Sequence, residues 1–246
     1  YDSALWKQGE ELHDALYNII KGHTEIQYDN LWSYYPVIDK KSNGKVWDMY
    51  SDVPVGTSSY EYTFSVDQCG NYSKEGDCYN REHIIPQSSF GSASPMQNDI
   101  HHVIPSDGYV NGQRGSLPFG TVGSANWTSQ NGSKRGSSSV AGYGGQVFEP
   151  IDEFKGDIAR SILYFVTRYE NTVDGYTSFE MFNGTESQAL EDWGISMLLD
   201  WHYNVDPVDQ REIDRNDAAY NYQGNANPFV NHPEYANLIW NPTSDT

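Results

Sequence analysis

The sequence predicts an α+β protein, mostly helical, folded as one domain around a small β-rich centre. Amphipathic patterns with the helical period occupy both ends of the chain, and short aromatic and β-branched segments lie between them. The aromatic content of 14%, with 19 tyrosines, is too high for a disordered chain. We therefore treat the 246 residues as a single domain with a substantial core.

The first predicted element is a helix over residues 4–20, with Ser3 as its N-cap. Its apolar positions recur with a period of about 3.6 residues, and they are Leu5, Leu12, Leu16, Ile19 and Ile20. Two strands are predicted next, over residues 46–50 and 60–64, which are aromatic and bounded by Gly, Pro and Ser. Residues 120–146, rich in Gly, Ser and Asn, predict a long surface loop.

Helices return over residues 151–224. The first is marked by Phe154, Ile158, Ile162, Phe165 and Tyr169, and the second by Leu190, Trp193, Met197, Leu198 and Trp201. A third is expected to start at Asp206, with Pro207 in its first turn, and to stop at Gly224.

The charge of the chain limits how it can meet nucleic acid. The net charge is −19, from 34 acidic and 15 basic residues. This argues against nucleic-acid binding over the whole surface and leaves only a local basic pocket. No apolar run approaches the length of about 18 residues needed for a membrane span.

Cys69 and Cys78 are the only cysteines, and a polar, glycine-containing stretch separates them. They are either two unrelated thiols or a small disulfide loop, and we favour the disulfide because no zinc-ligand pattern surrounds them. A disulfide favours an exported protein, secreted or periplasmic. The chain opens on Tyr1 without the basic and apolar regions of a signal peptide, so we expect a processed mature form.

The stretch from Cys78 to Gly120 concentrates chemistry-bearing side chains. It holds three of the seven histidines together with oxygen ligands, namely His83, His101, His102, Glu82, Asp99, Asp107 and Asn111. Zinc-type ligand spacing is absent, so the cluster suits one oxygen-ligated cation beside a histidine that moves protons. Each histidine could equally be structural, since the pattern alone does not separate these two interpretations.

The spacing also predicts how these side chains point. Glu82 and His83 lie on opposite faces if the backbone is extended. Asp107 is a good helix start, which would put Asn111 and Arg114 on one helical face. A cation beside an arginine would stabilise charge on a phosphodiester, although Glu82 and Arg114 could also be an ordinary ion pair.

Several segments, in order along the chain, resemble the bacterial endonuclease I family, exported nucleases with a ββα-metal (His-Me) finger. The resemblance spans about residues 45–236 and rests on residues 80–86, 99–105, 110–114, 155–160, 207–216 and 223–230. It implies that the β-rich centre, residues 46–120, carries a ββα-metal finger.

The resemblance also assigns roles. It implies His83 as general base, Glu82 and Asn111 as ligands of a catalytic Mg²⁺ (Mn²⁺ or Ca²⁺ as alternatives), and Arg114 as a catalytic side chain beside the metal. Substrate contacts are expected from Arg81, Arg114 and Arg160, and supporting roles behind the metal ligands from Asp99 and His101. One departure is that residues 84–98 contain no Lys or Arg, so a phosphate-holding arginine found there in some relatives must come from elsewhere or be missing.

We therefore expect an exported, Mg²⁺-dependent, sequence-nonspecific endonuclease that cleaves DNA and RNA. Nonspecific cleavage is consistent with contacts to phosphate and sugar, which read no base directly. We expect a monomer with no stable protein partner and no membrane span. The alternatives are a secreted, metal-stabilised module that binds carbohydrate or peptide through Tyr and Trp, and an inactive protein with a nuclease fold.

Overall fold

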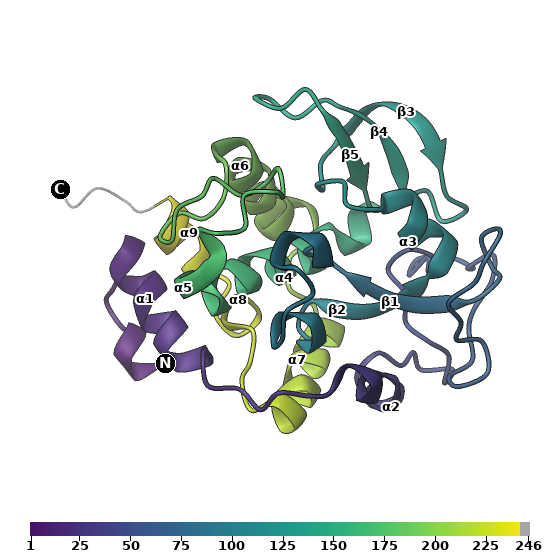
Figure 1. Cartoon of the computed structure of the whole chain (residues 1–246), viewed down its shortest axis with the longest axis horizontal. Helices are drawn as coiled ribbons and strands as arrows, with labels where there is room; N and C mark the ends of the chain where they lie inside the picture. The colour runs from purple at the N-terminus through teal and green to yellow at the C-terminus, as the bar shows by residue number, and fades with distance from the viewer. Residues whose placement is uncertain (242–246) are drawn as a thin grey trace.

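The computed structural model describes residues 1–241 and has the predicted α+β architecture. A helical body occupies the left of Figure 1, and two small antiparallel sheets lie to its right. The helices of the body are α1 (Gly9–Ile20), α4 (Lys155–Arg168), α5 (Glu170–Val173), α6 (Asp192–Asp200), α7 (Gln210–Gln223), α8 (Pro228–Asn231) and α9 (Tyr235–Trp240). Helix α4 is buried along almost its whole length and forms the centre of the main hydrophobic core. Within the described residues, none of the helices combines the length and the apolar character needed to cross a membrane.

The finger lies beside this body. Strand β1 (Tyr79–His83) pairs antiparallel with β2 (Val103–Asp107), and α3 (Gly108–Arg114) follows β2 directly. The side chain of Asp107 caps α3 by accepting the N–H of Val110 at 2.8 Å. This confirms the helix start that the sequence predicts.

Residues 120–146, predicted as a loop, instead contribute strands to a second sheet. It consists of β3 (Val122–Thr128), β4 (Lys134–Ser138) and β5 (Gln146–Glu149), all antiparallel. Close strand packing explains the glycine content at one position, because a Cβ on Gly136 would lie 2.1 Å from the carbonyl oxygen of Ser124. Gly and Ser have low β-propensity, and the pairing between strands overrides it here.

The predicted strands 46–50 and 60–64 are absent. These segments are irregular and are joined by one hydrogen bond from the N–H of Val46 to the carbonyl of Tyr62 (2.9 Å). Residues 46–50 are buried, and in the second segment Tyr62 is buried. Val46 and Tyr62 pack on Tyr79 of β1, whereas Trp47, Met49 and Tyr50 join the main hydrophobic core. Helix α2 (Leu31–Ile38) precedes them. Burial in the main core and against the finger, rather than strand pairing, therefore accounts for their apolar character.

Two predicted helix starts are also wrong. Helix α1 begins at Gly9 rather than residue 4, because Trp6 (φ 65°) and Gly9 (φ 55°) adopt left-handed conformations that interrupt a helix. Helix α7 begins at Gln210 with Asp209 as its N-cap. Asp206 instead accepts the N–H of Gly156 at 2.9 Å, at the start of α4. The predicted stop at Gly224 is confirmed (φ 79°).

The predicted disulfide between Cys69 and Cys78 is present. The loop that it closes carries Tyr72, whose ring lies across α3. A Cβ on Gly108 would lie 2.6 Å from Tyr72, and one on Gly112 would lie 2.8 Å from its hydroxyl. These two glycines therefore let the disulfide loop pack directly on the helix that carries Asn111.

Candidate active site

Glu82 lies near the end of β1 with its carboxylate turned into the protein. It is 2% exposed, and its Oε1 accepts hydrogen bonds from the Tyr50 hydroxyl (2.6 Å) and from Arg114 Nη1 (2.9 Å). Burial raises the pKa of Glu82, and the nearby Arg114 charge only partly opposes that shift. The carboxylate would thus be stabilised by a further positive charge.

Arg114 holds this end of β1 in place from α3. Besides Glu82, it donates to the carbonyls of His83 (2.8 Å), Ile84 (2.7 Å) and Leu117 (3.0 Å). These bonds use four of its five N–H groups, and the side chain is 1% exposed. The expected direct contact between Arg114 and substrate is not supported by this burial; its contacts favour a role in positioning Glu82 and the segment after it.

His83 points to the other face of β1. Its Nε2 lies 2.8 Å from the carbonyl of Gln97, and a carbonyl only accepts, so Nε2 carries the proton and Nδ1 holds the lone pair. Within the described residues, Nδ1 makes no hydrogen bond. Burial lowers the pKa of His83 to about 3, which keeps the imidazole neutral and able to accept a proton.

Asn111 presents an oxygen on the Glu82 side of the strand. Its Nδ2 donates to Asn80 Oδ1 (2.9 Å) and to the Arg81 carbonyl (3.2 Å), which uses both of its protons. Its Oδ1 has no hydrogen-bond partner among residues 1–241. Asn80 therefore fixes which atom of the Asn111 amide remains open.

Glu82 and Asn111 fit a hard divalent cation. Glu82 on β1 bonds to Arg114 of α3, and Asn111 of α3 bonds to Asn80, which lies on the same face of β1 as Glu82. In the part of the chain that the structure describes, no group of three or more His, Cys, Asp or Glu side chains is placed to hold a metal. A carboxylate and an amide oxygen alone suit Mg²⁺, which keeps several waters and binds substrate phosphate.

Arg81 lies on the His83 face of β1, as the alternation of a strand requires. Its guanidinium lies 3.5 Å from the ring centroid of Tyr28 and 4.6 Å from that of Trp32, and Nη1 donates to the Tyr28 carbonyl at 2.8 Å. The Tyr28 ring is also 5.8 Å from the His83 ring. Sequence reasoning missed Tyr28 and Trp32; their four-residue spacing, typical of one helical face, was the only signal available.

Asp99 and His101 form a buried network away from Glu82. Asp99 accepts from the hydroxyls of Tyr164 and Tyr169 (2.8 Å each), and His101 Nε2 bonds the Asn225 carbonyl (2.9 Å). Burial raises the pKa of Asp99, but the surrounding histidines and the hydrogen bond from Gln223 outweigh that effect and lower it. This arrangement joins the segment before β2 to α4 and the end of α7. No hydrogen bond links Asp99 or His101 to Glu82 or Asn111 within residues 1–241, and their role behind the metal ligands stays a prediction.

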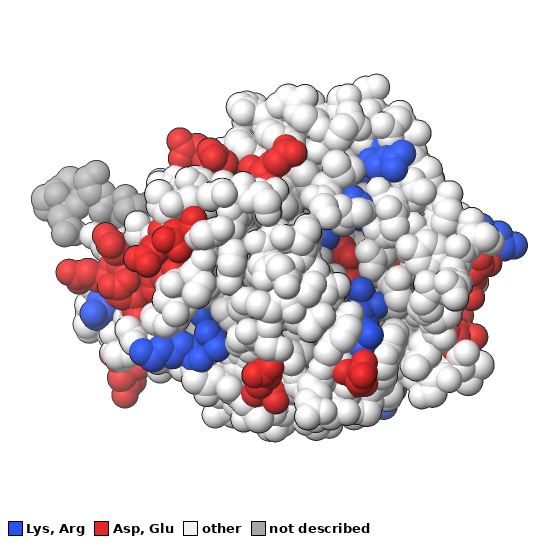
Figure 2. Space-filling view, in the orientation of Figure 1, with Lys and Arg blue, Asp and Glu red and all other residues white. Residues whose placement is uncertain are grey.

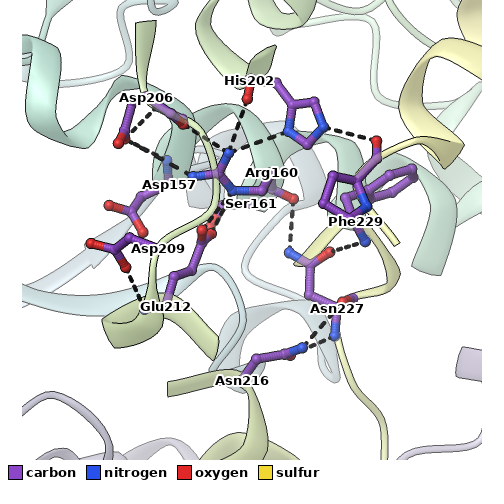
Figure 3. Close-up of polar contacts among 12 residues, drawn as sticks. Asp157, Arg160, Ser161, His202, Asp206, Asp209, Glu212, Asn216, Asn227 and Phe229 are labelled. Atoms are coloured by element: carbon purple, nitrogen blue, oxygen red, sulfur yellow. Dashed lines mark hydrogen bonds and ion pairs between the residues drawn. The ribbon is translucent and has the colours of Figure 1, made fainter. Parts of the chain in front are cut away.

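Arg160 is not at a surface (Figure 3). It is 1% exposed, its Nε lies 2.7 Å from the Glu212 carboxylate, and its Nη1 donates to the Asp206 carbonyl at 3.0 Å. A Cβ on Gly156 would lie 2.6 Å from its Nη2. In this structure Arg160 holds α4 against α7 inside the helical body, and this burial does not favour the predicted contact with substrate, which stays a prediction.

The charges on the surface are unevenly distributed. On the right half of Figure 2, several Lys and Arg atoms follow a hollow that runs from the region of β4 past α3 towards β1, with a few acidic atoms between and below them. Acidic atoms are densest on the left, around α1. A local positive strip beside the finger is how a chain with a net charge of −19 can receive a polyanion.

Comparison with known proteins shows which proteins the chain is similar to. The family model for endonuclease I matches residues 8–234 of the chain. The chain is 35% identical over 246 residues to the extracellular ribonuclease of Bacillus amyloliquefaciens, covering 98% of this chain and 77% of that protein. The extracellular ribonuclease of Bacillus subtilis (strain 168) has the same identity and the same coverage.

Proposed function

This chain belongs to the endonuclease I family and is a nucleic-acid-hydrolysing enzyme, and from that premise we propose an exported, Mg²⁺-dependent, sequence-nonspecific endonuclease of RNA and DNA. Family membership removes the non-catalytic binding module as an alternative. The names of the relatives support RNA as a substrate and an extracellular location, and the disulfide is consistent with export. We expect the enzyme to act as a monomer.

One observation carries the proposal: unpartnered acceptor atoms lie on both faces at the end of β1. His83 Nδ1 is the acceptor on one face, and Asn111 Oδ1, with the Glu82 carboxylate, is on the other. The proposal requires one phosphate, bound at the end of the strand, to reach both sets of atoms. Glu82 and Asn111 would hold the metal, which when bound supplies positive charge for a phosphate that gains negative charge in the transition state. Mn²⁺ or Ca²⁺ could occupy the same oxygen ligands.

His83 would act on the attacking water. Its neutral Nδ1 accepts a proton as the water oxygen attacks phosphorus, while the Gln97 carbonyl holds the ring by the Nε2 proton. Arg114 maintains the Glu82 carboxylate and the backbone beside His83 in position. Arg81, stacked on Tyr28, would contact a substrate phosphate on the His83 side.

The proposal is tested by nicking of supercoiled plasmid and cleavage of a labelled RNA, each with excess chelator and then with added Mg²⁺. Chelator should abolish both activities, Mg²⁺ should restore them, and the products should carry 5′-phosphates. Direct metal analysis of the chelated protein provides the control for tightly held metal. Full activity in metal-free protein would show that the metal-dependent mechanism is wrong.

A further inference from the structure

Arg135, on β4, differs from the other arginines in being partly exposed without forming an ion pair. Of the seven arginines, all within the described residues, five form ion pairs with carboxylates, namely Arg81, Arg114, Arg160, Arg211 and Arg215. Arg168 forms none but is buried, with 8% exposure. Arg135 is thus the one partly exposed arginine without an acidic partner in this part of the chain, although the sequence has 34 acidic residues.

Its guanidinium is nevertheless held in place. Nε donates to Asn126 Oδ1 (3.1 Å), and Nη1 lies 3.5 Å from the carbonyl of Gln113. Both acceptors are uncharged, so they orient the guanidinium without neutralising it. Three of its five N–H groups have no partner within residues 1–241, which leaves enough donors for a bidentate contact with an anion.

The position of Arg135 connects it to the proposed site. Gln113 lies on α3 between Asn111 and Arg114, so Arg135 approaches the helix that carries the candidate metal ligand. Trp127 lies directly opposite Arg135 in the β3–β4 register, on the same face of the sheet, and is half-buried. The hollow with basic atoms in Figure 2 passes this region.

We propose that Arg135 binds a backbone phosphate of the nucleic-acid substrate that flanks the scissile bond. The inference rests on the proposed nuclease function and extends it to a second contact point on the three-stranded sheet. Residues 84–98 contain neither Lys nor Arg. Under this proposal an arginine on β4 provides a phosphate contact that this segment cannot provide. Arginine is suited to this role because its planar fork matches two phosphate oxygens.

The test is binding rather than cleavage. Fluorescence anisotropy with a labelled 20-nucleotide single-stranded RNA, in excess chelator to prevent hydrolysis, is measured over a series of salt concentrations. Arg135→Gln should lower the slope of log affinity against log salt by about 0.7. The affinity gap to the unsubstituted protein should therefore narrow about fivefold for each tenfold rise in salt. Arg135→Lys should recover most of the slope but only part of the affinity.

The matched control is Lys21→Gln, which removes the same charge from an exposed residue at the end of α1. An equal slope change in both variants would show that only net charge matters and would overturn the proposal, as would an unchanged slope in Arg135→Gln. Hydrolysis of bis(p-nitrophenyl) phosphate separates this inference from the function on which it rests. That substrate has no phosphate besides the one that is cleaved, so its hydrolysis should be unchanged in Arg135→Gln, whereas no hydrolysis by any version would contradict the nuclease mechanism alone.

Discussion

Two buried arginine–glutamate pairs, one in the finger and one in the helical body, have similar chemistry but different surroundings. Arg114 and Glu82 are 1% and 2% exposed, and Arg160 and Glu212 are 1% and 6% exposed. Burial raises the pKa of both glutamates. Neither pair can be assigned to a function from burial or pKa alone.

The difference lies in the neighbouring atoms. Arg160 on α4 bonds to Glu212 on α7 and to the carbonyls of His202 and Asp206 in the segment between α6 and α7, as Figure 3 shows. Beside Arg114, by contrast, Asn111 Oδ1 and His83 Nδ1 have no partner within the described residues. Around Arg160, Glu212 Oε2 also lacks a hydrogen bond, but it belongs to the ion pair and lies 2.7 Å from Arg160 Nε. A buried ion pair is therefore informative about function when unpartnered acceptors from other residues lie next to it.

The largest effect is expected from substitution of His83, whose Nδ1 is an unpartnered acceptor in the finger. His83→Ala should lower the rate of nucleic-acid cleavage by about 10²–10⁴-fold, because the water loses its general base. Metal affinity, measured by calorimetry, should stay close to that of the unsubstituted protein because His83 points away from Glu82 and Asn111. His101→Ala is the control and should affect thermal stability more than rate, since His101 packs on Tyr164. A loss of metal binding in His83→Ala would reverse the assigned roles.

Substitutions in the Arg160–Glu212 pair of the helical body should change the free energy of unfolding rather than catalysis. At about pH 9, above the raised pKa of Glu212, Arg160→Met should lower the free energy of unfolding by about 3–5 kcal/mol, because the buried, ionised Glu212 loses its charge partner. Adding Glu212→Leu should recover part of that loss, and denaturant unfolding measures both variants. If Arg160→Met stayed fully stable and instead raised KM for nucleic acid, the original substrate-binding prediction would be correct and the comparison would fail.

A smaller effect should come from the residue that orients the metal ligand. Asn80→Ala removes one of the two acceptors of the Asn111 amide and should weaken Mg²⁺ binding by about 10–100-fold, the usual range for groups that support a metal ligand. Asn80→Asp retains an acceptor and should restore much of the affinity. Calorimetric titration of both variants decides this, and equal affinity in Asn80→Ala and the unsubstituted protein would show that Asn111 needs no such support.

The smallest effect is a pH dependence of stability. The pKa of Glu212 is raised to about 8 and that of Asp206 to about 7, mainly by burial, so the folded protein retains protons that the unfolded chain releases. Stability should therefore fall as pH rises towards these values and level off above them. Buried histidines with lowered pKa, such as His101 at about 4, act in the opposite sense only below about pH 6.5.

The window from pH 6.5 to 8 thus isolates the carboxyl groups. The decline for one proton is about 1.4 kcal/mol per pH unit, or about 3–6 °C of melting temperature for a chain of this size. Calorimetric melting at several pH values measures it, with Glu212→Gln as the comparison. A melting temperature that rises through this window would contradict the assignment.

The sequence predicted what depends on local patterns. The cap at Asp107, the stop at Gly224 and the Cys69–Cys78 bond follow from residues close together in the chain. The second sheet was missed because its pairing, such as Trp127 with Arg135, overrides weak propensities.

The candidate site shows the same limit. The motif identified Glu82, His83 and Asn111, whose roles as base and ligands are still predictions. It could not reveal that Arg160 is enclosed by Glu212, a residue 52 positions away. Tyr28 was missed for a similar reason, since only the folded chain places its ring on Arg81. Contacts that depend on distant segments are set by tertiary packing, which a single sequence does not display.

The packing of Tyr72 on α3 has a consequence for how this sequence can vary. A side chain larger than glycine at position 108 or 112 would occupy space that the tyrosine ring already fills. In related sequences we expect these three positions to change together: an alanine or serine on the helix should accompany a smaller residue, or a differently shaped loop, in place of the tyrosine. We therefore expect the disulfide loop and the helix to vary as one unit, and grafting either alone into another member of the family to bring mismatched surfaces together.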